Sequence, residues 1–503
     1  MDLGFLGHQS WWVRSGDVTL LIDPVLGEAM GHRTRLPVHP PRTIDVHELL
    51  PIDLVVLTHE HNDHTDLASL ALLPREIPIL VAPLMPSVVV RAIERLGFTV
   101  HRADPDVGLS AAPLHVQLLP GARRAPVSEG RVAQVLLTET HESDTVTVLL
   151  GVDTAISSRT IQAIRMGALP IPDAVVVSNN TQIPPPGVIG SGRDLLGPDP
   201  AVGFVGLALL RELCVTYTAE LPIPPTIILS GGGFVDTHEL GVPYCFDDHP
   251  KLAAWASELS HERTVVGPVP GQVLQLVPHA HGRPISVQSH PAVTSDPERL
   301  AKLRARPRPV GPLPLRTVLP SLDPAGWSAA LTRVDRSLQA LVAPLMAHPQ
   351  GDAILGCHRW NDRVVGPHRV LLRLVDGPDG RVAWRALDLR ESRFVALDGI
   401  DEATILQVWP FGIEVGLQDL DGLLSGTLLI WDVLGVALRH WSAHGPGMAS
   451  ALCALLSEAA RPEATAVALA DQLNALGHPT HPEQLVSPSP LRDSIEATAD
   501  ALT

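Results

Sequence analysis

The chain has 503 residues, of which 45% are hydrophobic and 18% are charged, so it can bury a sizeable core and is not a disordered chain. Its formal net charge is −17 and no basic stripe is present, which argues against a nucleic-acid partner. The 4 cysteines form no CxxC pair, which excludes a disulfide scaffold and a cysteine-rich metal site. We see no secretory signal and no apolar run of the roughly 20 residues that a membrane helix needs, so we expect a cytoplasmic protein with no membrane partner.

The first 300 residues alternate between strand-like and helix-like segments. Short runs rich in β-branched residues end in polar clusters, and amphipathic segments lie between them. The predicted strands are residues 18–22, 54–57, 79–82, 99–101, 132–137, 145–150, 174–177 and 226–229, and the predicted helices are residues 66–73 and 87–96. This alternation is typical of a layered α/β domain, in which functional side chains lie on loops at strand ends.

The composition changes towards the C-terminus. Residues 304–324 are rich in proline and arginine, which predicts a linker, placed here at residues 301–325. The segments expected after it are a helix at 326–347, strands at 370–374, 382–387 and 393–397, and helices at 420–440, 448–460 and 462–477. We therefore predict a first domain over residues 1–300 and a smaller α+β domain over residues 326–503.

The strongest chemical signal is HEHNDH at residues 59–64, directly after the apolar strand at 54–57. Imidazole and carboxylate groups are ligands that first-row metals prefer. A loop that turns off a strand end can direct two of these groups at one metal ion and two at a second. The motif therefore predicts a dinuclear metal site.

This motif after a buried strand resembles that of the metallo-β-lactamase superfamily. The resemblance implies an αββα sandwich with a dinuclear metal site at one edge, followed here by the smaller α+β C-terminal domain. It implies that His59 and His61 bind a first metal and that Asp63 and His64 bind a second. It also implies a third ligand for the first metal, a bridging aspartate and a last histidine further along the chain.

The candidates for these later ligands follow predicted strands. His141 is the preferred third ligand of the first metal, and Glu139 is the alternative, because some oxygen-using members of the superfamily carry a carboxylate there. Asp153 matches the position of the bridging aspartate. His238, in the glycine-rich stretch SGGGFVDTH, is the preferred last ligand, with His249 as its competitor.

A narrower resemblance is to the CMP-N-acetylneuraminate hydroxylases. The stretches that carry it are GGGFVDTH, DTVTVLL, VVGPVPGQVLQL, AWRALDLRESRFVAL and LDGLLSGTLLIWDVLGVALRHW. Those enzymes also contain a Rieske [2Fe–2S] domain bound by two cysteines and two histidines, and this sequence lacks that arrangement. The resemblance therefore implies non-heme diiron chemistry with electrons from an external donor.

Two reaction classes follow from the two resemblances. The favoured one is an O2-dependent diiron oxygenase of the hydroxylase type. The alternative is a dizinc or other di-metal hydrolase of a lactone, thioester or phosphoester, in which the metals lower the pKa of a bound water towards about 7. The expected cofactor is a pair of metal ions, with iron favoured and zinc or manganese as alternatives, and Asp63 and His238 are the predicted catalytic residues.

The substrate is expected to be a small molecule. Asn179 and Asn180 follow a predicted strand and offer neutral hydrogen-bonding groups near the mouth of the site. Arg193 is a candidate anchor for a carboxylate or a phosphate. His8 either lines the site or is a buried structural histidine. A homodimer is a possible assembly.

Overall fold

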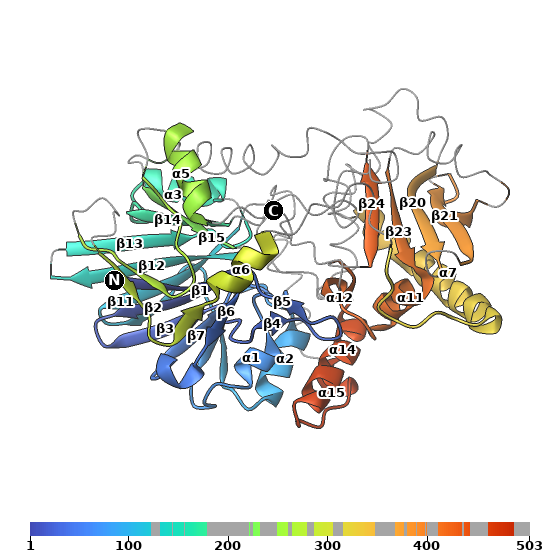
Figure 1. Cartoon of the computed structure of the whole chain (residues 1–503), viewed down its shortest axis with the longest axis horizontal. Coiled ribbons are helices and arrows are strands. Elements are labelled where there is room, and N and C mark those ends of the chain that lie inside the picture. The colour runs from blue at the N-terminus through green and yellow to red at the C-terminus, as the bar shows by residue number, and fades with distance from the viewer. Residues whose placement is uncertain are drawn as a thin grey trace.

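The computed structural model of the chain is drawn in Figure 1. It describes residues 1–121, 131–142, 144–154, 156–178, 221, 225–231, 249–259, 264–278, 286–304, 315–347, 368–376, 380–388, 390–397, 399, 411–434, 437–442 and 461–486. Within these residues, no helix is both long enough and apolar enough to cross a membrane.

The first sheet of the N-terminal half has the strand order β18-β17-β1-β2-β3-β7-β8-β9. Its strands are β1 (Asp2–Gly7), β2 (Ser10–Ser15), β3 (Val18–Ile22), β7 (Leu54–Leu57), β8 (Ile79–Val81), β9 (Val100–Arg102), β17 (Gln272–Gln275) and β18 (Ser286–Ser289). The neighbours β3, β7, β8 and β9 are parallel, so their carboxyl ends lie at one edge of the sheet.

The second sheet has the order β10-β11-β12-β13-β14-β15-β16. Its strands are β10 (Leu109–Ala111), β11 (Leu114–Pro120), β12 (Ala133–His141), β13 (Asp144–Leu150), β14 (Ala174–Ser178), β15 (Thr226–Ser230) and β16 (Val265–Val266). Leu20 and Val56 of the first sheet pack against Val135 and Val148 of the second, all with no exposed surface. The two sheets therefore form a sandwich around one apolar core.

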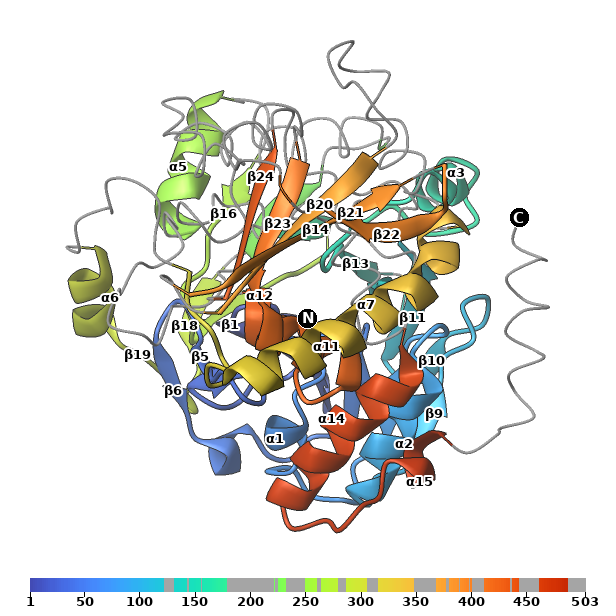
Figure 2. The ribbon, with the colours of Figure 1, turned by 90° about the vertical axis from the view of Figure 1, so that its right-hand side faces the viewer.

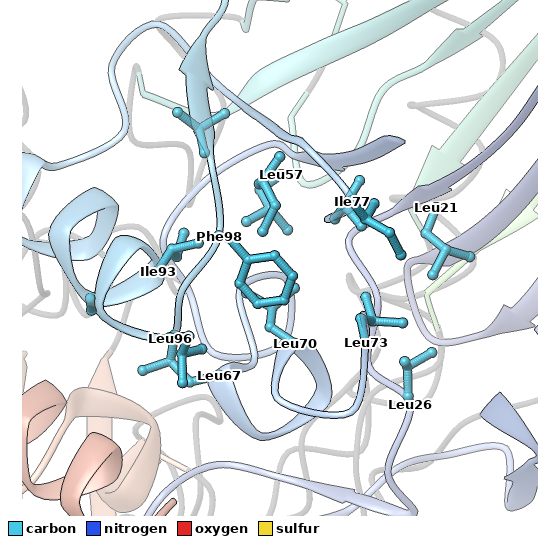
Figure 3. Close-up of a cluster of buried hydrophobic side chains, with 14 of the residues drawn as sticks. Leu21, Leu26, Leu57, Leu67, Leu70, Leu73, Ile77, Ile93, Leu96 and Phe98 are labelled. Carbon is cyan, nitrogen blue, oxygen red and sulfur yellow. The ribbon is translucent and has the colours of Figure 1, made fainter. Parts of the chain in front are cut away.

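Helices cover the outer faces of this sandwich. The helices α1 (Leu67–Leu70) and α2 (Ser87–Arg95) pack on the first sheet, where Leu57, Leu70, Ile93 and Phe98 share one cluster (Figure 3). The helices α3 (Ser158–Arg165) and α5 (His249–Leu259) pack on the second sheet. The short elements around them are β4 (Ala29–Met30), β5 (Leu36–Pro37), β6 (Arg42–Ile44), η1 (Val46–Leu49), β19 (Val293–Ser295) and α6 (Pro297–Arg304). The order of layers confirms the predicted αββα sandwich.

The C-terminal half contains a separate sheet in the order β22-β21-β20-β23-β24. Its elements are α7 (Pro324–Ala347), β20 (His368–Val375), β21 (Val382–Asp388), β22 (Arg393–Ala396), β23 (Phe411–Gly416), α11 (Leu417–Ser425), α12 (Ile430–Leu434) and β24 (Leu438–Ser442). Helix α7 lies across one face of this sheet (Figure 2), where its Trp327 and Leu338 pack against Leu372 and Leu387. This is the predicted smaller α+β unit.

The single helix predicted over residues 420–440 is wrong. The chain forms α11, then α12, then β24 in this interval. Gly426 follows α11 with φ of 85°, a left-handed conformation that ends a helix and that glycine adopts without a steric penalty. The helix predicted at residues 448–460 lies outside the described residues.

Two C-terminal helices pack on the N-terminal half of the molecule. These are α14 (Pro462–Ala475) and α15 (Glu483–Val486). Leu469, Leu473 and Leu485 belong to the same apolar cluster as Ile93 of α2, and Arg91 Nε donates to the Leu485 carbonyl at 2.5 Å. Residues 461–486 therefore complete the core of the first domain, although the sequence predicts them within a C-terminal domain over residues 326–503.

Candidate metal centre

The HEHNDH motif forms a tight, buried loop after β7. The His64 and Thr65 amides donate to the His61 carbonyl at 2.9 and 2.7 Å, and Thr65 Oγ1 donates to the His59 carbonyl at 2.6 Å. His59, His61, Asp63 and His64 are all at most 8% exposed. Buried imidazoles and carboxylates need polar partners, so the contacts of these four side chains decide what the loop can do.

Two imidazoles converge on one side of the site. His59 Nε2 lies 3.1 Å from His61 Nδ1 and 3.9 Å from Asp153 Oδ2. Two ligand atoms on one tetrahedral ion, with bonds of about 2.0–2.2 Å, lie ~3.3–3.6 Å apart. These three side chains therefore have the spacing of ligands to a single metal ion.

A second set converges beside the first. His64 Nε2 lies 3.0 Å from Asp153 Oδ2 and 3.6 Å from Asp63 Oδ2, and Asp63 Oδ2 lies 2.9 Å from His8 Nε2. Asp153 Oδ2 thus lies near imidazoles of both sets, as expected of a bridging aspartate. We call His8, His59, His61, Asp63, His64 and Asp153 the metal-centre cluster.

Asp23, at the end of β3, orients one of these imidazoles. Its Oδ2 lies 2.7 Å from His64 Nδ1, and its carboxylate also accepts from the Thr58 amide at 2.8 Å and the Thr58 hydroxyl at 2.6 Å. A carboxylate on the far nitrogen of a metal-binding histidine fixes the tautomer and turns the other nitrogen to the metal. Asp23 is not among the site residues predicted from the sequence, although its position at the end of a strand parallel to β7 is a usable signal.

Arg42 links the segments that contain His8 and Asp23 by hydrogen bonds. Its buried guanidinium donates to the Leu6 carbonyl at 2.9 Å and to the Val25 carbonyl at 2.6 Å. Burial lowers the pKa of Arg42 to about 10, so the group stays charged at neutral pH. One buried cation therefore holds both segments in register at the edge of the sandwich.

The cluster holds strongly perturbed groups. Burial alone would lower the pKa of His64, but the carboxylates of Asp153, Asp63 and Asp23 raise it well above 6.5. Burial and the neighbouring His64 lower the pKa of His59 well below its usual value. Burial would raise the pKa of Asp153, yet the nearby His64 holds it low. The three carboxylates around His64 therefore favour its protonated form, and a metal ion that binds this imidazole must displace a proton.

Neither Glu139 nor His141 joins this cluster, so both expected third ligands of the first metal need correcting. The Ala133 amide donates to the Thr58 carbonyl at 3.1 Å, so β12 begins at the edge of the sandwich where the metal-centre cluster lies. His141 lies eight residues along this strand, roughly 26 Å away at about 3.3 Å per residue. Glu139 instead accepts from Ser15 Oγ at 2.6 Å, and the His141 side chain is 57% exposed.

Neither candidate for the last histidine ligand, His238 or His249, is found in a described ligand set. His238, Asn179, Asn180 and Arg193 lie outside the described residues. His249 is buried at the start of α5, with its Nδ1 donating to the Pro268 carbonyl at 3.1 Å, and it belongs to none of the described ligand sets. His8 joins the cluster instead.

His8 reaches the cluster from the sharp turn between β1 and β2. It has φ of 54°, and its carbonyl accepts from the Gly231 amide at 2.7 Å. This left-handed conformation is costly for a residue with a side chain, so the surrounding contacts must hold it. Of the two roles left open for His8, the geometry favours the one at the site.

The chain is similar to several known proteins. Residues 19–163 match the family model described as the beta-lactamase superfamily domain. An isothiocyanate hydrolase from Delia radicum gut bacteria is 19% identical, over 55% of this chain and 100% of that one, with a TM-score of 0.39. CmlA, a diiron beta-hydroxylase from Streptomyces venezuelae, is 18% identical, over 55% of this chain and 54% of that one, with a TM-score of 0.36. No curated protein matches the chain.

Proposed function

We propose that the protein is a dinuclear metal-dependent hydrolase of a small molecule, starting from the match of residues 19–163 to the beta-lactamase superfamily domain. The observation that carries the proposal is the position of Asp153 Oδ2, 3.0 Å from His64 Nε2 and 3.9 Å from His59 Nε2. One carboxylate oxygen between imidazoles of two ligand sets is the arrangement that a pair of metals requires.

The described residues fit such a pair of metals. The cluster offers four imidazoles and two carboxylates, all from loops at one edge of the sandwich. Asp63 Oδ1 is buried and has no hydrogen-bond partner within the described part of the chain. A buried carboxylate oxygen with no partner costs free energy unless a cation binds there. His59, His61 and Asp153 would hold one metal, and Asp63, His64, His8 and Asp153 the other.

The donor set supports hydrolysis. When bound, two metals of this kind polarise a substrate carbonyl or phosphoryl group and lower the pKa of a water molecule. Asp63 would accept a hydrogen bond from the attacking water. The carboxylate of Glu139, which would have made the first ligand set more suited to iron, lies at the other end of β12. The described ligands are thus rich in imidazole, as zinc sites are. A lactone, a thioester or a phosphoester is the proposed substrate class.

A diiron oxygenase is the second candidate. The stretch DTVTVLL, which resembles the CMP-N-acetylneuraminate hydroxylases, forms β13 and leads directly to Asp153. The stretch AWRALDLRESRFVAL, which also resembles them, forms β21 and β22 of the C-terminal unit. In this case an external donor would supply the electrons, and iron would be the metal.

One experiment tests both candidates. The chain is produced with iron and zinc both available, its metal content is measured, and its optical spectrum is recorded. We expect two metals per chain, hydrolysis of an ester or lactone by the zinc form, and no oxygen uptake. Oxygen consumption that needs a reductant, together with near-ultraviolet absorption from iron, would favour the second candidate.

A variant pair tests the site itself. His59→Ala should lose at least one metal and all activity, because its Nε2 lies 3.1 Å from His61 Nδ1 and 3.9 Å from Asp153 Oδ2 in one ligand set. The control is His101→Ala, which removes an exposed imidazole on β9. Full metal content in His59→Ala would reject the proposed centre.

A further inference from the structure

A chain of hydrogen bonds lies behind Asp153, on the side away from His64. It begins at Gln9, which follows His8 in the turn between β1 and β2 and is 4% exposed. Gln9 Nε2 donates to Asp153 Oδ1 at 3.0 Å and to Ser178 Oγ at 2.7 Å. Ser178 Oγ also donates to Asp153 Oδ1, at 3.3 Å. Asp153 Oδ1 therefore accepts from two donors, Gln9 in the turn between β1 and β2 and Ser178 at the end of β14.

The orientation of the Gln9 amide is fixed from its other end. Ser230 Oγ donates to Gln9 Oε1 at 2.7 Å and accepts from Trp11 Nε1 at 3.1 Å. An ionised carboxylate only accepts hydrogen bonds, so the amide nitrogen must face Asp153 and the amide oxygen must face Ser230. The reversed amide would place oxygen against oxygen at Asp153.

We propose that Gln9 is a positioning residue that holds Asp153 Oδ1 away from the metals, so that Asp153 bridges them through Oδ2 alone. Asp153 Oδ2 faces His64 and His59, whereas Oδ1 is occupied by the Gln9 amide and the Ser178 hydroxyl. The inference rests on the proposed dinuclear centre. Gln9 thereby sets both the affinity of the centre and the distance between its metals.

The test replaces Gln9 by methionine, which has a similar shape and no hydrogen-bonding amide. Metal affinity is measured by competition with a chelator, using zinc and manganese as the metals. We expect Gln9→Met to weaken metal binding roughly 10- to 100-fold, as loss of a partner behind a metal ligand does. X-ray absorption of the loaded protein should show a longer metal–metal distance, because both oxygens of Asp153 can then bind. Loss of packing alone would not change that distance.

Two further variants make the result decisive. Ser178→Ala removes the weaker donor to Oδ1 and should shift metal affinity in the same direction by less. Gln418→Met removes a buried glutamine in α11 of the C-terminal unit and should leave metal binding unchanged.

The possible outcomes separate the two proposals. Wild-type metal affinity and an unchanged metal–metal distance in Gln9→Met would overturn this inference and leave the proposed function standing. If Gln9→Met does not fold, unchanged affinity in Ser178→Ala overturns the inference. A wild-type chain that binds no metal would overturn the proposed function and this inference together.

Discussion

Buried charges occur in two regions of the molecule, and they are satisfied in different ways. In the C-terminal unit a buried cation faces a carboxylate, as where Arg385 donates to both oxygens of Asp335 at 2.6 and 2.9 Å. At the edge of the sandwich the rings of His59 and His64 lie 4.0 Å apart, and His59 Nε2 faces His61 Nδ1. In the first region each charge has a partner of opposite sign within the chain. Converging imidazoles imply a cation that the chain does not supply.

The largest expected effect follows from removing the shared ligand. Asp153→Ala takes away the oxygen that lies near both ligand sets, so we expect loss of both metals and of activity. Metal at about 1,000 times its dissociation constant stabilises the folded wild type by about 4 kcal/mol, and the variant should lose this gain. Thermal unfolding with and without added zinc measures it. The control is Asp421→Ala, which removes a carboxylate paired with Arg333 at the surface of the C-terminal unit.

The next effect concerns pH and the C-terminal unit. Asp419 accepts from the Val318 and Leu319 amides at 2.9 and 2.8 Å, yet its burial outweighs them and raises its pKa to about 6. An acid whose pKa is higher in the folded state than the ordinary 3.8 destabilises that state once it ionises. This cost is absent below pH 3.8 and complete above pH 6, and it amounts to roughly 3 kcal/mol at about 1.36 kcal/mol per pKa unit.

The measurement compares Asp419→Asn with the wild type by urea unfolding at about pH 4 and pH 7. Between these pH values the wild type should lose about 2 kcal/mol more of its unfolding free energy than the variant does, because part of the cost is already present at pH 4. Identical pH dependence in the two proteins would show that Asp419 ionises normally.

A smaller effect should follow from breaking an ion pair of the C-terminal unit. Arg385→Met leaves Asp335 without its partner, but Asp335 is 41% exposed and water can solvate it. We therefore expect a loss of about 1–2 kcal/mol in the unfolding free energy, with both metals retained. Loss of metal in this variant would contradict the separation of the two regions.

The smallest effect is expected for the residues at the other end of β12. His141→Ala removes an exposed imidazole and should change the unfolding free energy by less than about 0.5 kcal/mol, with full metal content. Glu139→Gln should also retain both metals, although it weakens the contact with Ser15. Metal loss in either variant would reinstate the residue as a ligand.

The sequence predicts those site residues that directly follow a strand in the chain. His59, His61, Asp63 and His64 follow a buried strand, and Asp153 follows another, so their side chains lie at strand ends whatever the pairing. The sandwich follows from the same alternation of apolar runs. These features need no knowledge of which strand lies next to which.

The remaining parts depend on strand direction and on turns. Glu139 was the alternative ligand because some oxygen-using members of the superfamily carry a carboxylate there. Strand β12 runs away from the metal-centre cluster, however, and only its pairing reveals this direction. His8 and Gln9 reach the centre from a two-residue turn, and Asp23 reaches it from the neighbouring parallel strand. Contacts between residues far apart in sequence leave no pattern in the local sequence, so they could not be predicted.

The end of α11 at Gly426 could have been predicted, since an isolated glycine near the end of a helical pattern can mark the end of the helix.

The packing of α14 and α15 on α2 has a practical consequence for anyone who divides this protein. A fragment that ends in the linker predicted at residues 301–325 would leave the apolar side of α2, including Ile93, facing water. The missing piece is a short peptide, residues 461–486, whose Leu469, Leu473 and Leu485 fit that surface. Supplied separately, this peptide would have the apolar side chains needed to cover α2 again, so the first domain can be tested as a complex of two polypeptides.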